Sequence, residues 1–179
     1  MRGRLWASIA AGLMLMTASP VWSQPPMPKP APEMSQLDFF EGTWNCQGKT
    51  NASPFGPAGT MTSTARIQDD LGGFWQTGSV KGTMEKMPPF EAVFHTTYDS
   101  AGKQFVMTFF DNMGGWARST SRGWQKDQLV YEGDMNMPGQ KPMRGRDTFT
   151  RSGASLKHTW EMQMDGKWVP LGEETCTKK

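Results

Sequence analysis

The residue whose chemistry stands out in this sequence is a histidine in the segment LKHTWEMQM. Because side chains alternate along a strand, Leu156, His158, Trp160, Met162 and Met164 share one face, and polar residues occupy the other. His158 is the only titratable group on this apolar face. It is either a hydrogen-bonded core histidine or a polar anchor that orients a mostly apolar ligand. We take His158 as the first candidate for such an anchor.

Neighbouring strand faces supply apolar side chains that could surround the same ligand. The alternative is that these side chains fill a solid core, because a small barrel is either packed or holds one ligand. The predicted ligand-binding residues are His158, Trp160, Met162, Phe94, Tyr98, Phe105, Met107, Phe109 and Tyr131.

Methionine offers a second kind of chemistry, since the chain contains 15 of these residues. Two Met-x-Met pairs, Met135 with Met137 and Met162 with Met164, each project two thioethers to one side of a strand. Soft thioether sulfur suits Cu(I), so these four residues form an alternative metal site with His158 as a nitrogen donor. Methionine is also an adaptable core filler, and aromatic residues rather than histidines surround the pairs. We therefore favour the core interpretation.

Motifs for catalysis are missing. The sequence has no G-x-S-x-G, H-E-x-x-H, Walker loop or G-x-G-x-x-G, and it contains only two histidines. The second, His95, shares a strand face with Glu91 and Val93 that we predict to be the outer one. The acidic pairs Asp69-Asp70 and Glu173-Glu174 are predicted to be solvated charges. We predict no catalytic residue and no cofactor, and an enzyme acting on a small molecule in a barrel mouth is a further alternative.

The N-terminus predicts export. MRGRLWASIAAGLMLMTASPVWSQ has two arginines, an apolar run and small residues before a cut after Ser23, which is the form of a secretory signal peptide. The apolar run is too short for a membrane span, although an uncleaved anchor is the alternative. Loss of Arg2 and Arg4 would leave 17 basic residues against 17 acidic ones. A mature chain near neutrality without a basic stripe argues against nucleic acid and anionic membranes as partners.

The remaining sequence alternates between short strand-like runs and turns. We predict a signal peptide over 1–23, a Pro-rich tether over 24–34 and one domain over 35–179. In the domain, Ser35 is a predicted N-cap of a short amphipathic helix that Gly42 ends. Connections too short for crossover helices favour an all-β antiparallel up-and-down barrel of about ten strands, with a two-sheet sandwich as the alternative. The predicted strands are 43–50, 60–71, 74–83, 90–99, 104–112, 116–125, 128–136, 143–152, 155–164 and 167–177.

The positions of the two cysteines in the sequence allow a test of the predicted closed barrel. Cys46 lies in the first predicted strand and Cys176 in the last. Closure of an up-and-down barrel makes these strands neighbours, which brings the two thiols within bridging distance. Export to an oxidising compartment would allow the bond to form. We therefore predict a Cys46–Cys176 disulfide, with two unrelated buried thiols as the alternative.

Several segments together resemble a known family. LDFFEGTWNCQG, LGGFWQTGSVKG, HTTYDSAGKQFVMTFFDNMGG and KPMRGRDTFT followed by HTWEMQMDGK are similar to the secreted bacterial proteins of domain-of-unknown-function family fifteen seventy-nine. The resemblance spans about Leu37 to Lys178 and implies a lipocalin-like, calycin-type barrel without an assigned activity. Similar barrels include the nitrobindins, which bind haem through a histidine near the C-terminus. The corresponding stretch here, WVPLGEETC, has no histidine, so haem is not expected.

These observations favour a periplasmic or secreted, non-enzymatic protein that binds or carries a small apolar or amphipathic molecule inside a barrel. No nucleic acid and no stable membrane anchor are expected. The sequence makes no prediction of the ligand's identity or of the oligomeric state.

Overall fold

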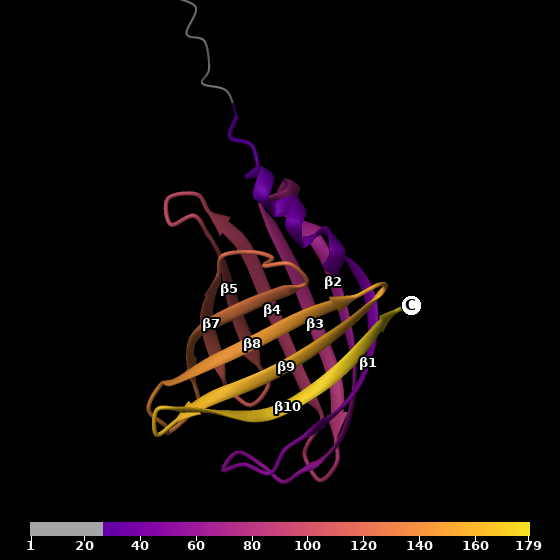
Figure 1. The fold of residues 1–179 in the computed structure, drawn as a ribbon, viewed down its shortest axis with the longest axis vertical. Coiled ribbons are helices and arrows are strands. Elements are labelled where there is room, and N and C mark those ends of the chain that lie inside the picture. Colours follow the sequence, from indigo (N-terminus) through magenta and orange to yellow (C-terminus); the bar gives the residue numbers. More distant parts are fainter. Residues whose placement is uncertain (1–26) are drawn as a thin grey trace, which may run out of the picture.

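Ten strands follow one another along the chain, and each pairs antiparallel with its sequence neighbours (Figure 1). The computed structural model describes residues 27–179, so the predicted signal peptide lies outside the described residues. The helical segments are two 3₁₀ helices, η1 (Pro32–Phe40) and η2 (Leu71–Gly73). The strands are β1 (Gly42–Thr50), β2 (Gly59–Asp70), β3 (Trp75–Met84), β4 (Phe90–Asp99), β5 (Gln104–Asp111), β6 (Trp116–Ser121), β7 (Gln128–Asn136), β8 (Met143–Ser152), β9 (Ser155–Met164) and β10 (Lys167–Lys178).

Pairing of the first strand with the last closes the sheet. β1 pairs with β10 as well as with β2, so the ten strands form a closed barrel and the sandwich alternative is wrong. Cys46 lies opposite Cys176 in this register, and the two are joined by a disulfide. The predicted bond is therefore confirmed. It links the two ends of the sheet at the point of closure.

Tight turns keep neighbouring strands antiparallel. At the β9–β10 hairpin, Asp165 and Gly166 both have positive φ angles, 49° and 76°, as a type I′ turn requires. The predicted strands agree with the observed ones to within one residue except at β6, which ends at Ser121 rather than 125. Gly123 adopts a φ of 88°, which ends the strand, and the indole of Trp124 donates a hydrogen bond to the Gln36 carbonyl of η1. The chain thus leaves the sheet to contact the helix.

The helix η1 differs from the predicted one in type and start. It begins at Pro32, whose fixed φ suits a first helical position, and its N-cap is Ala31. Ser35 lies inside the helix and donates to the Pro32 carbonyl, so the N-cap prediction was wrong. Met34, Leu37 and Phe40 are buried. A 3₁₀ helix has three residues per turn, so this spacing of three places all of them on one face.

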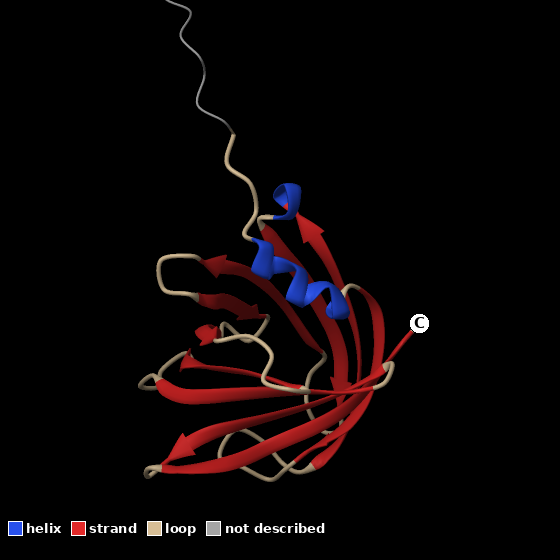
Figure 2. Ribbon diagram, turned by 45° about the horizontal axis from the view of Figure 1, so that its top comes forward, coloured by secondary structure: helices blue, strands red, loops and turns tan. Residues whose placement is uncertain are grey.

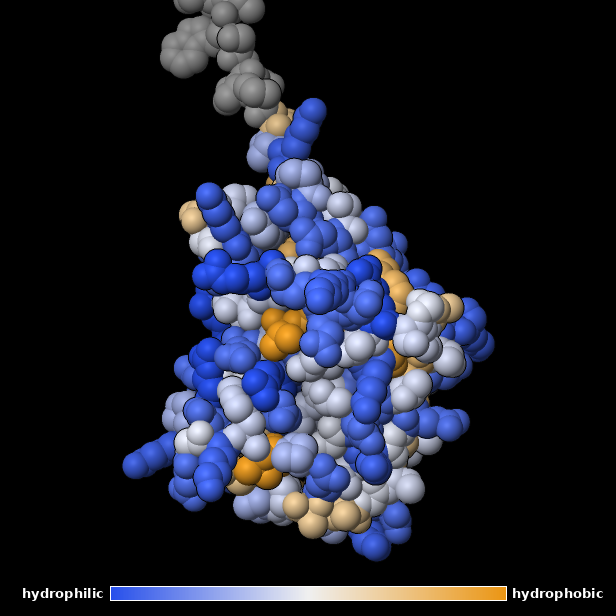
Figure 3. Space-filling model, viewed as in Figure 1, coloured by the Kyte–Doolittle hydropathy of each residue, from blue (hydrophilic) through white to orange (hydrophobic). Residues whose placement is uncertain are grey.

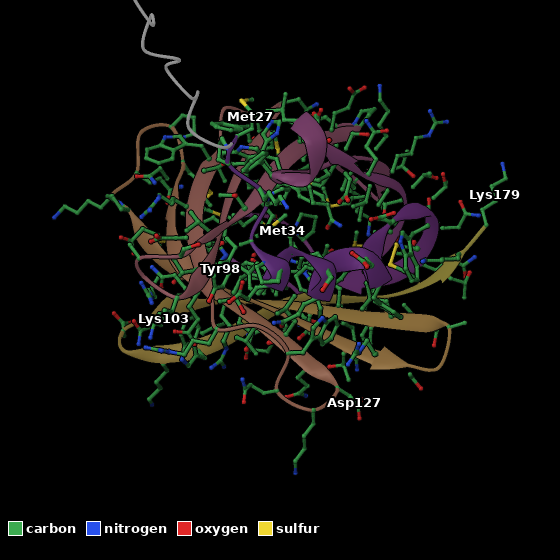
Figure 4. All side chains as sticks on the ribbon, turned by 90° about the horizontal axis from the view of Figure 1, so that it is seen from above. Met27, Met34, Tyr98, Lys103, Asp127 and Lys179 are labelled. Atoms are coloured by element: carbon green, nitrogen blue, oxygen red, sulfur yellow. A yellow bond between two sulfur atoms is a disulfide. The ribbon has the colours of Figure 1, made fainter. Side chains whose placement is uncertain are left out.

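That buried face plugs one end of the barrel. Viewed from above, η1 lies across the opening, with Met34 and Tyr98 at this end (Figure 4). Three side chains donate to carbonyls in the second half of η1: Gln76 to Leu37, Trp44 to Phe40, and Trp124 to Gln36. Met34, Leu37 and Phe40 join Trp44, Phe105 and Leu129 in the main apolar cluster. The core of the protein therefore lies at the plugged end.

The opposite end of the barrel carries the loops that join β1 to β2 (51–58), β3 to β4 (85–89) and β7 to β8 (137–142), and Figure 2 shows loops in tan at both ends of the strands. The face of the barrel over β8, β9 and β10 is largely hydrophilic, as expected when apolar side chains point inward (Figure 3). No helix among residues 27–179 is long and apolar enough to span a membrane.

Candidate functional site

Below the plug, the barrel encloses a cavity of about 390 Å³. Its wall reaches from Leu37 and Phe40 at the plug to loop residues Phe55, Met87 and Met113 at the other end. The half of the barrel remote from η1 is therefore hollow, and its loops form the mouth. Most of the lining residues are apolar.

Seven of the nine predicted ligand-binding residues line this cavity. Tyr98 and Phe105 do not, because they pack edge to face at 5.1 Å in the cluster under η1. The plug occupies the end of the barrel toward which these two side chains point. The seven that line the cavity are His158, Trp160, Met162, Phe94, Met107, Phe109 and Tyr131.

Two interior glycines set the positions of the aromatic walls. A Cβ at Gly78 would overlap the ring of Phe94, and a Cβ at Gly172 would overlap the indole of Trp160. Each ring therefore lies flat over the backbone of the neighbouring strand. Glycine at these positions keeps both rings against the wall and leaves the centre of the barrel open.

His158 lies in the cavity wall, and both of its ring nitrogens are occupied. Its Nδ1 lies 3.1 Å from Glu174 Oε1, and its Nε2 lies 3.0 Å from Asp147 Oδ1. Ionised carboxylates only accept hydrogen bonds, so both nitrogens must donate, which requires the imidazolium form. The ring also stacks on Phe149 with centroids 4.4 Å apart, a contact that favours a cation.

The electrostatic environment agrees with this geometry. Burial lowers the pKa of His158, but the hydrogen bonds that its ring donates to Asp147 and Glu174, and the attraction of their charges, outweigh burial and raise the pKa to about 9. The side chain of His158 is 18% exposed, and the exposed part faces the cavity that it lines. His158 is therefore positively charged at neutral pH.

The polar group extends beyond the histidine to two further side chains. Glu174 accepts a second hydrogen bond, at Oε2 from the Ser63 hydroxyl at 3.0 Å, and its side chain is only 12% exposed. The prediction that Glu173 and Glu174 are both solvated is therefore wrong for Glu174. Glu173 does point outward, where it pairs with Lys49 and Lys157. We call Ser63, Asp147, His158 and Glu174 the polar cluster.

The alternation of side chains along β8 and β10 indicates that the acidic members of the polar cluster, Asp147 and Glu174, point inward. Asp147 stands two residues before Phe149 on β8, and Glu174 stands two residues before Cys176 on β10. Each acid therefore shares the inward face of a buried neighbour. The predicted disulfide places the Cys176 side chain on the inner face of the barrel, so alternation also implies that Glu174 points inward.

The polar cluster is not arranged as a nucleophile with its base. The Ser63 hydroxyl donates to a carboxylate rather than to the imidazole, and an imidazolium with both N–H groups engaged has no lone pair to accept a proton. Among the described residues, Cys46, Glu174 and Cys176 come close enough together to hold a metal ion. The disulfide occupies both sulfur atoms of that group.

Methionine dominates the cavity toward the mouth. Met135 and Met137 both line it, whereas of the second pair Met162 does and Met164, the last residue of β9, does not. The methionines in the lining are Met61, Met84, Met87, Met107, Met113, Met135, Met137 and Met162. The lining also includes Ser119, whose buried Oγ has no hydrogen-bond partner among the described residues.

Comparison with known proteins supports the fold and identifies the family. No curated protein matches the chain. The crystal structure of Rv2717c from M. tuberculosis is similar, with a TM-score of 0.67 and 12% sequence identity over 84% of this chain and 99% of that one. This likeness shows a shared fold. A family model described as Protein of unknown function (DUF1579) matches residues 29–178, and the chain therefore belongs to that family, as the resemblance of its sequence segments predicted.

Proposed function

We propose that this protein binds a small amphipathic molecule inside the barrel, without transforming it. The observation that carries the proposal is an apolar cavity with one group of convergent polar side chains, the polar cluster, in its wall. Ligand pockets commonly have this composition, with a few placed polar groups fixing the orientation of a mostly apolar ligand. The cavity volume of about 390 Å³ lies within the range of about 300–1,000 Å³ of such pockets.

Both ends of the cavity suit this role. The plug seals one end with the apolar cluster of η1, so a ligand would enter among the loops at the other. The methionines there have flexible, polarisable side chains that adapt to irregular shapes. We expect the apolar part of the ligand to contact these methionines, Trp160 and Phe109, and its polar part to reach the polar cluster.

Export is part of the proposal. A disulfide persists in an oxidising compartment, which agrees with the signal peptide expected from the N-terminal sequence. The binding protein would then act in the periplasm or outside the cell.

Dye binding with a cavity-filling variant tests the proposal. A Cβ added at Gly145 would meet no atom closer than 3.9 Å, so Gly145→Leu directs a side chain into the cavity without displacing the backbone. We expect wild type to bind the neutral dye N-phenyl-1-naphthylamine and decanol to displace it. Gly145→Leu should weaken dye binding by about tenfold or more, roughly 1.4 kcal/mol. Arg144→Leu, which adds the same side chain to the outer face of β8, should bind as wild type does.

Two results would contradict the proposal. One is the absence of dye binding by the folded wild-type protein. The other is unchanged binding by a Gly145→Leu protein whose circular dichroism and melting temperature match those of wild type.

Cu(I) binding is a second candidate, favoured by the presence of Met135, Met137 and Met162 in one cavity wall. Thioethers carry no proton at neutral pH, so affinity resting on them should be nearly flat from pH 5 to 7. A Cu(I) competition titration of wild type and of Met135→Leu with Met162→Leu tests it. Leucine conserves the apolar volume, so only copper affinity should change. Undetectable Cu(I) binding by wild type would end this candidate.

A further inference from the structure

The hydrogen bonds within the polar cluster leave one oxygen atom free. Glu174 Oε1 accepts from His158, Glu174 Oε2 accepts from Ser63, and Asp147 Oδ1 accepts from His158. Asp147 Oδ2 makes no hydrogen bond with any residue of 27–179. The Asp147 side chain lines the cavity and is 29% exposed. The unused hydrogen-bonding atom that the cluster offers to a ligand is therefore an acceptor.

The net charge of the cluster also favours a ligand group that donates a hydrogen bond or carries a positive charge. Two carboxylates and one imidazolium sum to a net charge of −1 in a largely apolar cavity. Apart from His158, Arg146 is the only basic residue among the described lining residues, and Glu161 binds its guanidinium at 2.7 and 2.8 Å while Trp168 stacks on it. Lys157, next to His158 in sequence, pairs with Glu173 at 2.8 Å on the outer face. No protein cation compensates the cluster from within the described cavity wall.

A further carboxylate near the mouth does not compensate the negative charge of the cluster either. Asp111 lines the cavity, but its Oδ1 accepts hydrogen bonds from the backbone amides of Met113 and Gly115 in the β5–β6 turn. Its charge adds to the negative potential rather than opposing it. An uncompensated carboxylate away from bulk water is costly, and a cation or a strong donor from outside can offset that cost.

We propose that the ligand carries a protonated amine that donates a hydrogen bond to Asp147 Oδ2. This inference rests on the proposed function and narrows it to one ligand class, amphipathic amines. Trp160, whose ring lies tilted against His158 with centroids 5.2 Å apart, adds a π system beside the cluster that also attracts a cation. An anionic head, such as the carboxylate of a fatty acid, would meet like charge and find no free N–H donor on His158.

Three ligands with the same alkyl chain and different head groups separate the contribution of the head group to the affinity from that of the chain. Decylamine, decanol and decanoate are titrated at pH 7 against protein-bound N-phenyl-1-naphthylamine. We expect decylamine to bind at least about tenfold more tightly than decanol, since hydrogen bonds to charged groups are the stronger kind. Decanoate should bind more weakly than decanol.

Asp147→Asn supplies the matched variant. Asparagine can still accept from His158, but it replaces the charged Oδ2 with an amide that donates. The advantage of decylamine over decanol should fall to about threefold or less, and this ratio is insensitive to any effect of the substitution that both ligands share. Asp134→Asn is the control, because Asp134 is 67% exposed on the outside of β7 and should leave all three affinities unchanged.

The outcomes are distinguishable. Equal binding of amine and alcohol to wild type, or tighter binding of decanoate, would overturn the inference and leave the proposed function standing. Failure of all three ligands to displace the dye would overturn both. If Asp147→Asn does not fold, judged by circular dichroism, the wild-type comparison alone still decides. An unchanged amine preference in folded Asp147→Asn would refute the role of Asp147.

Discussion

The charge on His158 should make the stability of this protein depend on pH in a predictable direction. Its pKa is about 9 in the folded protein, against 6.5 for an unperturbed histidine. A raised pKa contributes stability that is fully present below 6.5 and is lost as the pH rises through 9. The difference of about 2.5 pH units corresponds to about 3 kcal/mol of unfolding free energy at 1.36 kcal/mol per unit. Asp147 from β8 and Glu174 from β10 are the charged groups that face the ring.

The assay compares urea unfolding of wild type and His158→Gln between pH 6 and pH 9.5, followed by tryptophan fluorescence. Lysines and tyrosines titrate in both proteins, so the informative quantity is the difference between their unfolding free energies. We expect wild type to be the more stable at pH 6 and this difference to shrink by about 3 kcal/mol by pH 9.5. His95→Gln is the matched control, since His95 is the only other histidine and does not line the cavity.

A pH-independent difference between wild type and His158→Gln would refute the assignment of an imidazolium. The hydrogen bonds to Asp147 and Glu174 would then join a neutral ring, and the net charge inferred for the cluster would be wrong. A difference that grows with pH would contradict the sign of the argument.

Three further predictions concern stability. Replacing Cys46 and Cys176 with serine should lower the unfolding free energy by up to about 5 kcal/mol in urea melts, because the bond closes a loop with a separation of 130 residues; unchanged stability would count against it. Ser119→Ala should leave the unfolding free energy unchanged or raise it, because the buried hydroxyl has no hydrogen-bond partner among the described residues. Ser63→Ala should lower the unfolding free energy by about 1.5–3 kcal/mol, because it removes a hydrogen bond to Glu174. Equal effects of the two substitutions on the denaturation midpoint would contradict this. Gly172→Ala should cost about 1–3 kcal/mol because its Cβ would overlap the Trp160 indole and the Lys49 carbonyl, with a fall in melting temperature as the readout. A variant as stable as wild type would contradict this close packing.

Most of the fold was predictable because period-two alternation and turn residues are local signals. The disulfide followed from topology, since closure alone makes the first and last strands neighbours. The end of β6 was missed because Gly123 breaks the strand to let Trp124 contact η1, a tertiary contact with no local signal. The 3₁₀ type of η1 was also missed, although buried residues at 34, 37 and 40 repeat with its period of three.

The candidate site was only partly predictable. The alternation of side chains predicted that His158 and the aromatic and methionine residues of the cavity wall share inward faces, because it determines on which side of the sheet a side chain lies. It could not show that η1 would occupy one end of the barrel and take Tyr98 and Phe105 into the core. Asp147 and Glu174 were missed because acidic residues on strands are usually solvated. Their burial depends on pairing with a histidine that the register of β8, β9 and β10 brings between them.

The placement of the chain ends has a practical consequence for experiments on this protein. The backbone N–H of Lys179 donates to the Thr43 carbonyl at 2.8 Å, and residues 27–31 lead directly into η1, so Lys179 and the first described residues lie on the plugged side (Figures 1 and 4). An affinity tag, a fluorescent fusion or a sensor surface attached after Lys179 would therefore sit opposite the mouth. Immobilised protein would present its loops to the flowing solution, and ligand entry could be measured without obstruction by the support.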